Sequence, residues 1–406
     1  MSTKTKIEKK YFSKYKKPLV EFPNLLETQL ASYKWLIEHG LKEVFKEFSP
    51  INDYSEKKFM LEFTSFSLGE PKFDEYYAKA NKLTYDAQLK ARVKLMNKTL
   101  GGSSKEQEIF LADIPLMTDH GTFIINGVER VIVSQLARSF GVFFTDLDLK
   151  GKKLFGAKII PARGVWIEIE SDSDGVLYVR IDKKRKFSIT SLLRVLGFTD
   201  ESMLAAAATD EVRHILKLSI EKDPAKTSDE SFIEIYKRLR DGDLATTENA
   251  KEFINSLFSS ERYDLSPVGR FRFNKRFGKP MTDKDLERRT ISKEDLMVIV
   301  EHIISLNNTP NSKADDIDHL GQRRVRYVGE LLQQKIRVGM TQIKRNIQDR
   351  MSTIDVATAL PINIINQRPL QARIKEFFTT NQLSQFMSQE NVLNEIEHLR
   401  ILSALG

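Results

Sequence analysis

The stretch RVRYVGELLQQKIRVGMTQIKRNIQDRM, residues 324–351, decides how this chain must be organised. Its apolar residues recur every three or four positions, which is typical of an amphipathic α-helix. The stripe consists of Ile336, Met340, Ile343, Ile347 and Met351. Such a helix gains most of its stability by packing its stripe against other elements. Those elements must come from elsewhere in the chain, so we expect a first module that is discontinuous in sequence.

Helix and strand signals precede this stretch. Residues 18–46 predict a proline-started helix with Leu26, Leu30, Trp35 and Leu41 among its apolar positions. FMLEFTSFSLG (59–69) predicts an extended segment. FIINGVERVIV (123–133) has Asn-Gly between two β-branched runs, which is a strong hairpin signal. Residues 165–181 predict a second hairpin around SDSDG, because apolar and polar residues alternate on both sides of it.

From about residue 186 the pattern changes to helices. Four segments have helical spacing: ITSLLRVLG (189–197), ESMLAAAATDEVRHILK (201–217), ESFIEIYKRLR (230–240) and KEDLMVIVEHIISL (293–306). Ser292 is the expected N-cap of the last one. EKDPAKTSDE (221–230) predicts a solvated loop, and NNTPNSKADD (307–316) a break. The predicted fold class is therefore α+β multidomain, with two mixed α/β modules that change over near residues 135 and 315.

Composition limits the class of protein. A chain of 406 residues exceeds one ordinary core, and 41% hydrophobic with 30% charged residues describes a folded protein. No run of 18 apolar residues exists, which argues against a membrane span, and the N-terminus does not resemble a secretory signal. The absence of cysteine excludes disulfides and thiolate sites and fits a reducing, intracellular compartment. A net charge of +8 favours a polyanionic partner.

Three segments concentrate the positive charge. Residues 1–19 carry seven lysines against Glu8, which fits a nucleic-acid arm or a solvated terminus. RFRFNKRFGK (270–279) predicts a strand with phosphate-binding arginines, or a strand with phenylalanines inward and charges outward. Residues 323–350 hold eight basic residues against Glu330 and Asp349. Strong polyanion binding through these segments would fall steeply with salt.

No self-contained catalytic site is visible in the sequence. A Walker A loop is absent, LGGSSK (100–105) is interpreted as a flexible loop, and the six histidines lie far apart. The carboxylates of Asp315, Asp316 and Asp318 are groups that could bind Mg²⁺, but a capping or structural role is the favoured interpretation. Three hypotheses stay open: a nucleic-acid-binding scaffold, one piece of a larger enzyme, and a small-molecule enzyme with an unrecognised site.

Four long segments resemble the N-terminal region of the bacterial RNA polymerase beta subunit. They are LADIPLMTDHGTFIINGVERVIVSQLARSFGVFF (111–144), RYDLSPVGRFRFNKRFG (262–278), DDIDHLGQRRVRYVGELLQQKIRVGM (315–340) and KEFFTTNQLSQFMSQENVLNEIEHLRILSALG (375–406). Their order and spacing match the family over nearly the whole chain. The resemblance implies a basic arm (1–17), a protrusion (18–134 and 318–377), a lobe (135–317) and the start of a fork region (378–406) that is truncated at Gly406.

The resemblance also implies function. It predicts one wall of the DNA cleft in a DNA-directed RNA polymerase, a cytoplasmic, nucleoid-associated nucleotidyltransferase. The implied partners are DNA, nascent RNA and the beta-prime, alpha and sigma subunits. The family holds its catalytic Mg²⁺ on beta-prime, so no catalytic or metal-binding residue is expected here, and the isolated chain is expected to be inactive. The alternative is a non-catalytic nucleic-acid-binding scaffold derived from the same fold.

Seven residues match a family pocket for an unstacked guanine of the non-template strand: Arg138, Trp166, Asp182, Ile317, Asp318, Arg323 and Leu405. The alternatives are structural: Trp166 in a hairpin core, Asp182 paired with Lys183 or Arg185, and Arg323 on a phosphate. Further candidates for DNA phosphates are Arg270, Arg272, Arg324 and Arg326.

A rifamycin pocket is also implied by the resemblance. Its matching positions are Val133, Gln382, Gln385, Phe386, Ser388, His398, Ile401, Ser403 and Leu405. Two of them depart from the family pattern, because Ser388 stands where the family has an aspartate and Ile401 where it has an arginine. Val392 also replaces a proline. Loss of both charges predicts poor rifamycin binding.

Overall fold

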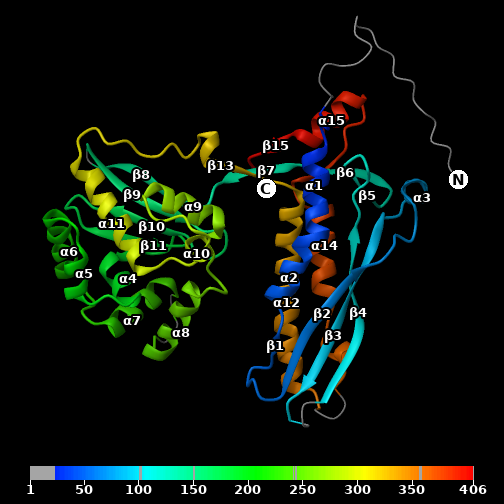
Figure 1. Cartoon of the computed structure of the whole chain (residues 1–406), viewed down its shortest axis with the longest axis horizontal. Coiled ribbons are helices and arrows are strands. Elements are labelled where there is room, and N and C mark those ends of the chain that lie inside the picture. The colour runs from blue at the N-terminus through cyan, green and yellow to red at the C-terminus, as the bar shows by residue number, and fades with distance from the viewer. Residues whose placement is uncertain are drawn as a thin grey trace, which may run out of the picture. The chain divides into compact units, whose positions relative to one another are not determined.

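A computed structural model describes residues 23–99, 103–149, 151–240, 242, 245–355 and 359–405 (Figure 1). The chain forms two compact units, one from the residues up to Ala137 together with those from Val325 onward, and one from Arg138–Arg324. The predicted α+β class with a discontinuous first module is confirmed. The boundaries 134/135 and 317/318, and the names protrusion, lobe and fork, stay predictions. The basic arm at 1–17, residues 100–102 of LGGSSK and Gly406 lie outside the described residues.

The first unit packs helices on an antiparallel sheet of order β1-β2-β3-β4. The strands are β1 (Ile51–Asn52), β2 (Phe59–Leu68), β3 (Asp86–Asn97) and β4 (Ser103–Pro115). The helical elements are α1 (Glu27–Trp35), a π-helical turn (Leu36–Gly40), α2 (Leu41–Glu47), α3 (Glu75–Ala80), α12 (Val328–Thr353), α13 (Pro361–Ile364) and α14 (Arg368–Thr379). The predicted helix at 18–46 therefore exists in its described part, interrupted by the π-helical turn.

Helix α12 carries the predicted stripe into the core of this unit. Ile336, Met340, Ile343, Ile347 and Met351 are all at most 2% exposed. The helix begins at Val328 instead of residue 324, because Arg323–Arg326 form strand β13. Its backbone comes very close to α1 at Gly329, where a Cβ would lie 2.1 Å from the carbonyl oxygen of Ser32. Only glycine permits this approach.

The Asn-Gly hairpin is confirmed as β5 (Phe123–Ile125) and β6 (Val128–Ile132). Asn126 and Gly127 both have positive φ angles, 51° and 80°, as a two-residue turn of this kind requires. Strand β14 (Ser384–Phe386) pairs with β6 and joins the end of the chain to this hairpin. Helix α15 (Val392–Arg400) follows, and β15 (Leu402–Ser403) pairs in parallel with β7 (Ser134–Arg138).

The second unit contains a five-stranded antiparallel sheet of order β12-β11-β10-β9-β8. Its strands are β8 (Gly141–Leu149), β9 (Lys152–Ile160), β10 (Ile167–Ser171), β11 (Leu177–Ile181) and β12 (Phe187–Ser188). Its helices are α4 (Ile189–Val195), α5 (Asp200–Ala206), α6 (Asp210–Lys222), α7 (Ser228–Leu239), α8 (Thr247–Phe258), α9 (Ser266–Arg276), α10 (Asp283–Glu287) and α11 (Lys293–Asn308). The predicted hairpin at 165–181 is confirmed by the pairing of β10 with β11. Ser292 caps α11 by accepting from the N–H of Asp295 at 3.3 Å.

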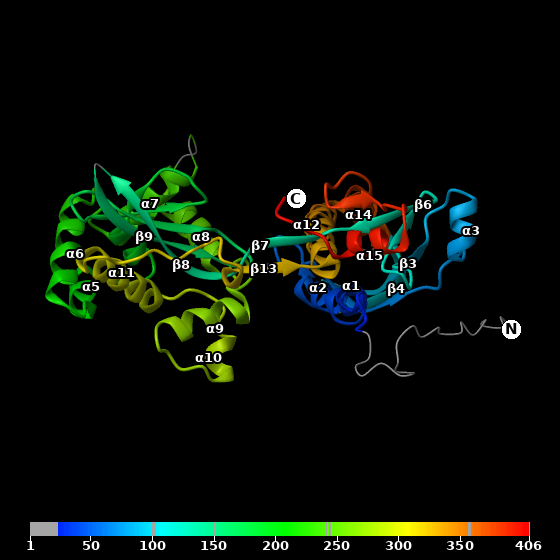
Figure 2. The ribbon, with the colours of Figure 1, turned by 90° about the horizontal axis from the view of Figure 1, so that it is seen from above.

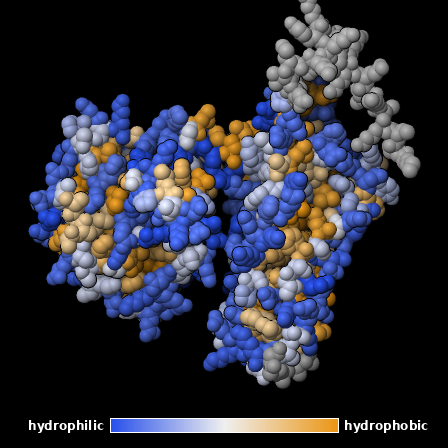
Figure 3. All heavy atoms as spheres, viewed as in Figure 1, coloured by the Kyte–Doolittle hydropathy of each residue, from blue (hydrophilic) through white to orange (hydrophobic). Residues whose placement is uncertain are grey.

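Each unit has its own buried apolar cluster. Hydrophilic residues prevail on the face of the molecule drawn in Figure 3, with apolar side chains scattered among them. Within the described residues, no helix is both long and apolar enough to cross a membrane.

Two local predictions in the second unit are wrong. RFRFNKRFGK does not form a strand, because its residues up to Arg276 belong to helix α9. ESMLAAAATDEVRHILK divides into α5 and α6, because Thr209 caps a new helix by accepting from the N–H of Val212 at 3.3 Å. The Phe/Arg alternation of 270–277 fits a strand locally, but the buried partners of this segment favour a helix.

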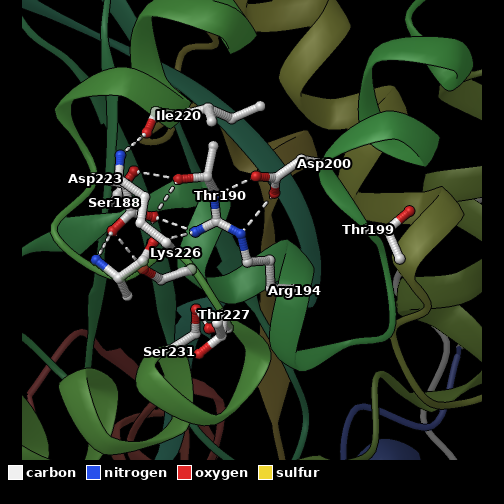
Figure 4. Close-up of polar contacts among 12 residues, drawn as sticks. Ser188, Thr190, Arg194, Thr199, Asp200, Ile220, Asp223, Lys226, Thr227 and Ser231 are labelled. Atoms are coloured by element: carbon white, nitrogen blue, oxygen red, sulfur yellow. Dashed lines mark hydrogen bonds and ion pairs between the residues drawn. The ribbon is translucent and has the colours of Figure 1, made fainter.

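The loop predicted to be solvated at 221–230 instead contains a buried carboxylate (Figure 4). Asp223 is 2% exposed and accepts hydrogen bonds from Ser191 Oγ at 2.8 Å and Arg194 Nη1 at 2.9 Å, and also from the hydroxyl of Thr190. Arg194, 4% exposed, also binds Asp200 at 2.6 Å. This network fastens the loop onto α4 through Asp223, while most of the other residues of 221–230 are exposed as predicted.

Candidate nucleic-acid interface

The segment before β13 is fixed to the edge of the second unit's sheet by Asp315. Its N–H donates to the carbonyl oxygen of Phe144 at 2.8 Å, and its Oδ2 accepts from the N–H of Phe144 at 2.7 Å. Both carboxylate oxygens also bind the guanidinium of Arg276, at 2.7 and 2.9 Å. These four bonds attach Asp315 to the edge strand β8 and to helix α9, and they hold the residues that follow.

Asp316 shapes the turn that presents Ile317 and Asp318. Its Oδ1 accepts from the N–H groups of Asp318 at 3.0 Å and His319 at 3.2 Å. Two of the three aspartates thus have the structural roles that the sequence favoured. The carboxylate of Asp318 is exposed, and no described residue pairs with it. Ile317 is half-buried and lines a groove of about 330 Å³ together with Asp315.

Trp166 and Asp182 are joined by two reciprocal hydrogen bonds. The backbone N–H of Trp166 donates to Asp182 Oδ1 at 2.9 Å, and the backbone N–H of Asp182 donates to the Trp166 carbonyl oxygen at 3.0 Å. Asp182 adopts a left-handed conformation with φ of 48° at the end of β11, where a short polar side chain can bond locally. The Trp166 side chain is half-buried and Asp182 is exposed. Asp182 therefore fixes the backbone that carries the aromatic ring.

The loop before Trp166 rests on the RYDLSP segment at 262–267. The N–H groups of Ala162 and Arg163 donate to the Asp264 carbonyl oxygen at 2.8 and 3.1 Å, and the Asp264 N–H returns a bond to Arg163 at 2.8 Å. Gly164, with φ of 114°, lies so close that a Cβ would be 2.9 Å from the buried ring of Tyr263. The sequence does not reveal these roles of Tyr263 and Asp264, because the residues they contact lie about 100 positions away.

Arginine side chains lie over a run of phenylalanines at the start of β8. Arg324 lies 4.4 Å from the ring centre of Phe140, and Arg272 lies 5.7 Å from that of Phe143. Arg272 also donates to the Gly321 carbonyl oxygen at 3.1 Å and to the side chain of Gln322. A guanidinium that stacks on a ring can still donate through its edge, as Arg272 does.

The remaining predicted arginines differ in accessibility. Arg138 is exposed at the end of β7, and Arg323 is half-buried at the start of β13. Arg326 lies in the first unit and is bound to Glu330 at 3.2 Å and Gln135 at 3.0 Å. Arg270 is 2% exposed and donates to Asp295 at 2.8 Å and to the carbonyl oxygens of Arg288 and Thr290. Arg270 therefore does not fit the predicted phosphate contact, because an internal carboxylate neutralises it.

Six of the seven guanine-pocket residues belong to the second unit: Arg138, Trp166, Asp182, Ile317, Asp318 and Arg323. Leu405 belongs to the first unit and is 64% exposed.

Among the residues matched to a rifamycin pocket, Gln385 and Ser388 contact His398 in the first unit. His398 Nδ1 accepts from the Ser388 N–H at 3.2 Å, and Nε2 lies 3.1 Å from Gln385 Oε1. Burial lowers the pKa of His398, so the imidazole is neutral at pH 7. Asn394, which sequence analysis did not single out, donates to the Ser388 hydroxyl at 2.7 Å. Val133 is buried and its N–H donates to the Leu383 carbonyl oxygen at 2.8 Å.

The other residues of this set are more open. Phe386 is 63% exposed and lies 4.3 Å from the guanidinium of Arg130, and Ile401 is 44% exposed. Gln382 is also exposed, and Ser403 is half-buried. Val392 is 71% exposed at the start of α15. Ile401 therefore presents an apolar side chain where the family pattern has a guanidinium.

The described residues contain no group of three or more His, Cys, Asp or Glu side chains arranged to hold a metal ion. Asp315 and Asp316 have their oxygens engaged by Arg276 and by backbone N–H groups, so this aspartate trio does not fit a Mg²⁺ site.

Comparisons with known proteins agree with the architecture. Residues 139–326 match the family described as RNA polymerase Rpb2, domain 2, which is nearly the extent of the second unit. The subunit beta of DNA-directed RNA polymerase from Syntrophomonas wolfei is 45% identical over 97% of this chain. That from Chloroflexus aggregans is 43% identical over 99% of the chain. The chain spans about a third (35%) of the length of each of these relatives.

Proposed function

We propose that this chain belongs to the beta-subunit family of DNA-directed RNA polymerases and forms one wall of the DNA cleft in the assembled, multisubunit enzyme. In this role it contacts downstream and non-template DNA and the RNA path and works with beta-prime, alpha and sigma subunits. The proposal rests on similarity over nearly the entire chain and on a net charge of +8. It places the chain in the cytoplasm, on the nucleoid.

The most specific part of the proposal is a guanine pocket on the second unit. The observation that supports it is the unpaired, exposed carboxylate of Asp318, held on a segment whose other two aspartates are engaged. A carboxylate can accept from both N1 and N2 of guanine, and guanine alone among the DNA bases presents these two donors side by side. Trp166 supplies an aromatic face on a backbone fixed by Asp182. Base stacking on such a face is worth about 1–3 kcal/mol.

The arginines have a different role in this proposal. Arg138 and Arg323 bind phosphates that flank the guanine, and Arg272 and Arg324 extend the same contact along the phenylalanine run. Phosphate contacts position a strand without reading its bases. Specificity then comes from Asp318, and affinity from the arginines.

The chain does not catalyse on its own in this proposal. The family resemblance assigns the Mg²⁺ ligands to beta-prime, and two of the three aspartates here, Asp315 and Asp316, are engaged in structural bonds. Purified residues 1–406 should therefore form no phosphodiester bonds with any divalent metal. Template-dependent RNA synthesis by the pure chain would contradict this part of the proposal.

The experiment that tests the pocket measures the lifetime of competitor-challenged open complexes made by a polymerase that contains this segment. Templates differ only in one downstream non-template base. Asp318→Ala should remove the preference for guanine at that position. Arg323→Ala should shorten lifetimes for all four bases and reduce the salt slope by about 0.7–0.9. Asp210→Ala, which removes an acid that is 95% exposed, is the matched control. An intact guanine preference in Asp318→Ala would refute the pocket.

A further inference from the structure

Helix α9 buries two polar side chains on its inward side and exposes two apolar ones on its outward side. Its inward side buries Arg270 and Asn274, which are 2% and 3% exposed, beside Phe273. Its outward side carries Val268, which is 53% exposed, and Phe271, which is 43% exposed. At 100° per residue, Val268, Phe271, Arg272 and Lys275 fall within an arc of about 100°. We call these four residues the α9 outward face.

The buried side of α9 is satisfied within the protein. Arg270 and Lys279 bind opposite oxygens of Asp295, each at 2.8 Å, and Asn274 donates to the Pro280 carbonyl oxygen at 2.8 Å. Pro267 occupies the first turn of the helix, where its fixed φ favours the helical conformation. These bonds fix the rotation of the helix about its own axis, and Phe271 is exposed as a consequence.

The outward face is basic as well as aromatic. Residues 266–276, SPVGRFRFNKR, contain no acidic residue. Lys275 is exposed, and no described residue pairs with it. Arg272 is held over Phe143 and against the Gly321 carbonyl oxygen, so it links α9 to the segment that carries Asp318 and Arg323. Figure 2 shows α9 and α10 together at the periphery of the second unit.

We propose that the α9 outward face binds single-stranded nucleic acid, with one base stacked on Phe271 and the flanking phosphates on Arg272 and Lys275. An exposed aromatic ring beside two cations, on a helix without acidic residues, is the pattern of single-strand binding surfaces, because every base has a π-face. A duplex keeps its bases stacked inside and cannot use Phe271. The inference rests on the proposed function in that it extends the guanine pocket along the same strand through Arg272.

The test measures binding of the full 406-residue chain to two fluorescein-labelled 15-mers by anisotropy. One is oligo-dT and the other carries a single central guanine. Phe271→Ala and Phe271→Leu should weaken binding of both strands by about 5- to 100-fold, since stacking is lost in both. Phe271→Trp should bind as tightly as the parent or more tightly. Ile362→Ala, which removes an apolar side chain of α13 that is 58% exposed, is the control and should change affinity less than twofold.

The salt dependence of binding tests the two charged residues of the face. Arg272→Ala and Lys275→Ala should each reduce the slope of log K against log salt by about 0.7, whereas Phe271→Ala should leave that slope unchanged. Lys237→Ala, an exposed lysine of α7, is the charge control. Equal single-strand affinity of the parent, Phe271→Ala and Phe271→Leu would overturn the inference and point to a protein partner for this face.

The two oligonucleotides distinguish a failure of this inference from a failure of the guanine pocket. Asp318→Ala should affect only the strand with guanine, whereas Phe271→Ala should affect both. If Phe271→Ala has no effect while Asp318→Ala removes the guanine preference, the α9 outward face is refuted and the pocket stands. If Phe271→Ala weakens both strands while the guanine preference survives Asp318→Ala, the pocket is refuted and the α9 outward face stands.

Discussion

Replacement of Asp223 by alanine should unfold the second unit far more readily than any surface change of the same charge. The Asp223 side chain is fully buried and accepts from Ser191, Thr190 and Arg194. Its removal leaves Arg194, whose side chain is 3% exposed, with only the partly exposed Asp200 as a counter-charge. Breaking a buried pair by removing one partner destabilises by about 3–5 kcal/mol, because the other charge stays desolvated.

The assay is urea unfolding followed by tryptophan fluorescence. The chain has two tryptophans, and Trp166 is the one in the second unit. A Trp35→Phe background therefore reports the second unit alone, which avoids treating a two-unit chain as two-state. With a slope of about 2 kcal/mol/M, a loss of about 3–5 kcal/mol lowers the urea midpoint by about 1.5–2.5 M. Asp210→Ala breaks the ion pair of an acid that is 95% exposed and should cost less than about 1 kcal/mol. Equal midpoints for Asp223→Ala and Asp210→Ala would refute the reasoning.

Three further outcomes are expected. Burial and the nearby Asp113 raise the pKa of Asp86 to about 6 from 3.8, with Lys72 opposing, so the folded state holds this proton between about pH 4 and 6. The free energy of unfolding of the first unit should therefore fall as pH rises through that window. Asp86→Asn should remove this pH dependence and stabilise the unit at pH 7 by about 1–2 kcal/mol in urea unfolding. An unchanged pH profile in the variant would contradict this. Gly329→Ala should destabilise by about 1–3 kcal/mol in the same assay because its Cβ meets the Ser32 carbonyl oxygen, whereas Val338→Ala on the exposed side of α12 should be nearly neutral. A polymerase that contains this segment should be poorly inhibited by rifamycin, and joint Ser388→Asp and Ile401→Arg should strengthen inhibition at least tenfold; tight inhibition of the unsubstituted enzyme would show that neighbouring groups compensate.

Much of the local structure could be predicted because its signals are local. The stripe of α12, the Asn-Gly turn of β5–β6 and the cap at Ser292 each depend on residues only a few positions apart. The need for a discontinuous first unit also followed, because a long amphipathic helix requires a partner that its neighbours in sequence do not supply. For the candidate site, resemblance identified the residues, and their roles stay predictions until the pocket is tested.

What sequence could not determine were the partners of polar groups. Arg270 and Arg272 are two residues apart in an alternating pattern, yet one is paired with Asp295 inside the unit and the other lies over Phe143 at its surface. EKDPAKTSDE has the composition of a solvated loop, but Asp223 lies in the core because Arg194 and Ser191 bind it there. A charged residue can be buried only where its partner is also buried, and that partner is about 25–30 residues away in both cases. The sequence by itself therefore determined most of the helices, the hairpins and the two-unit organisation of this chain. Only the tertiary structure made a helix of Ser266–Arg276 and decided which charges of the chain face the solvent.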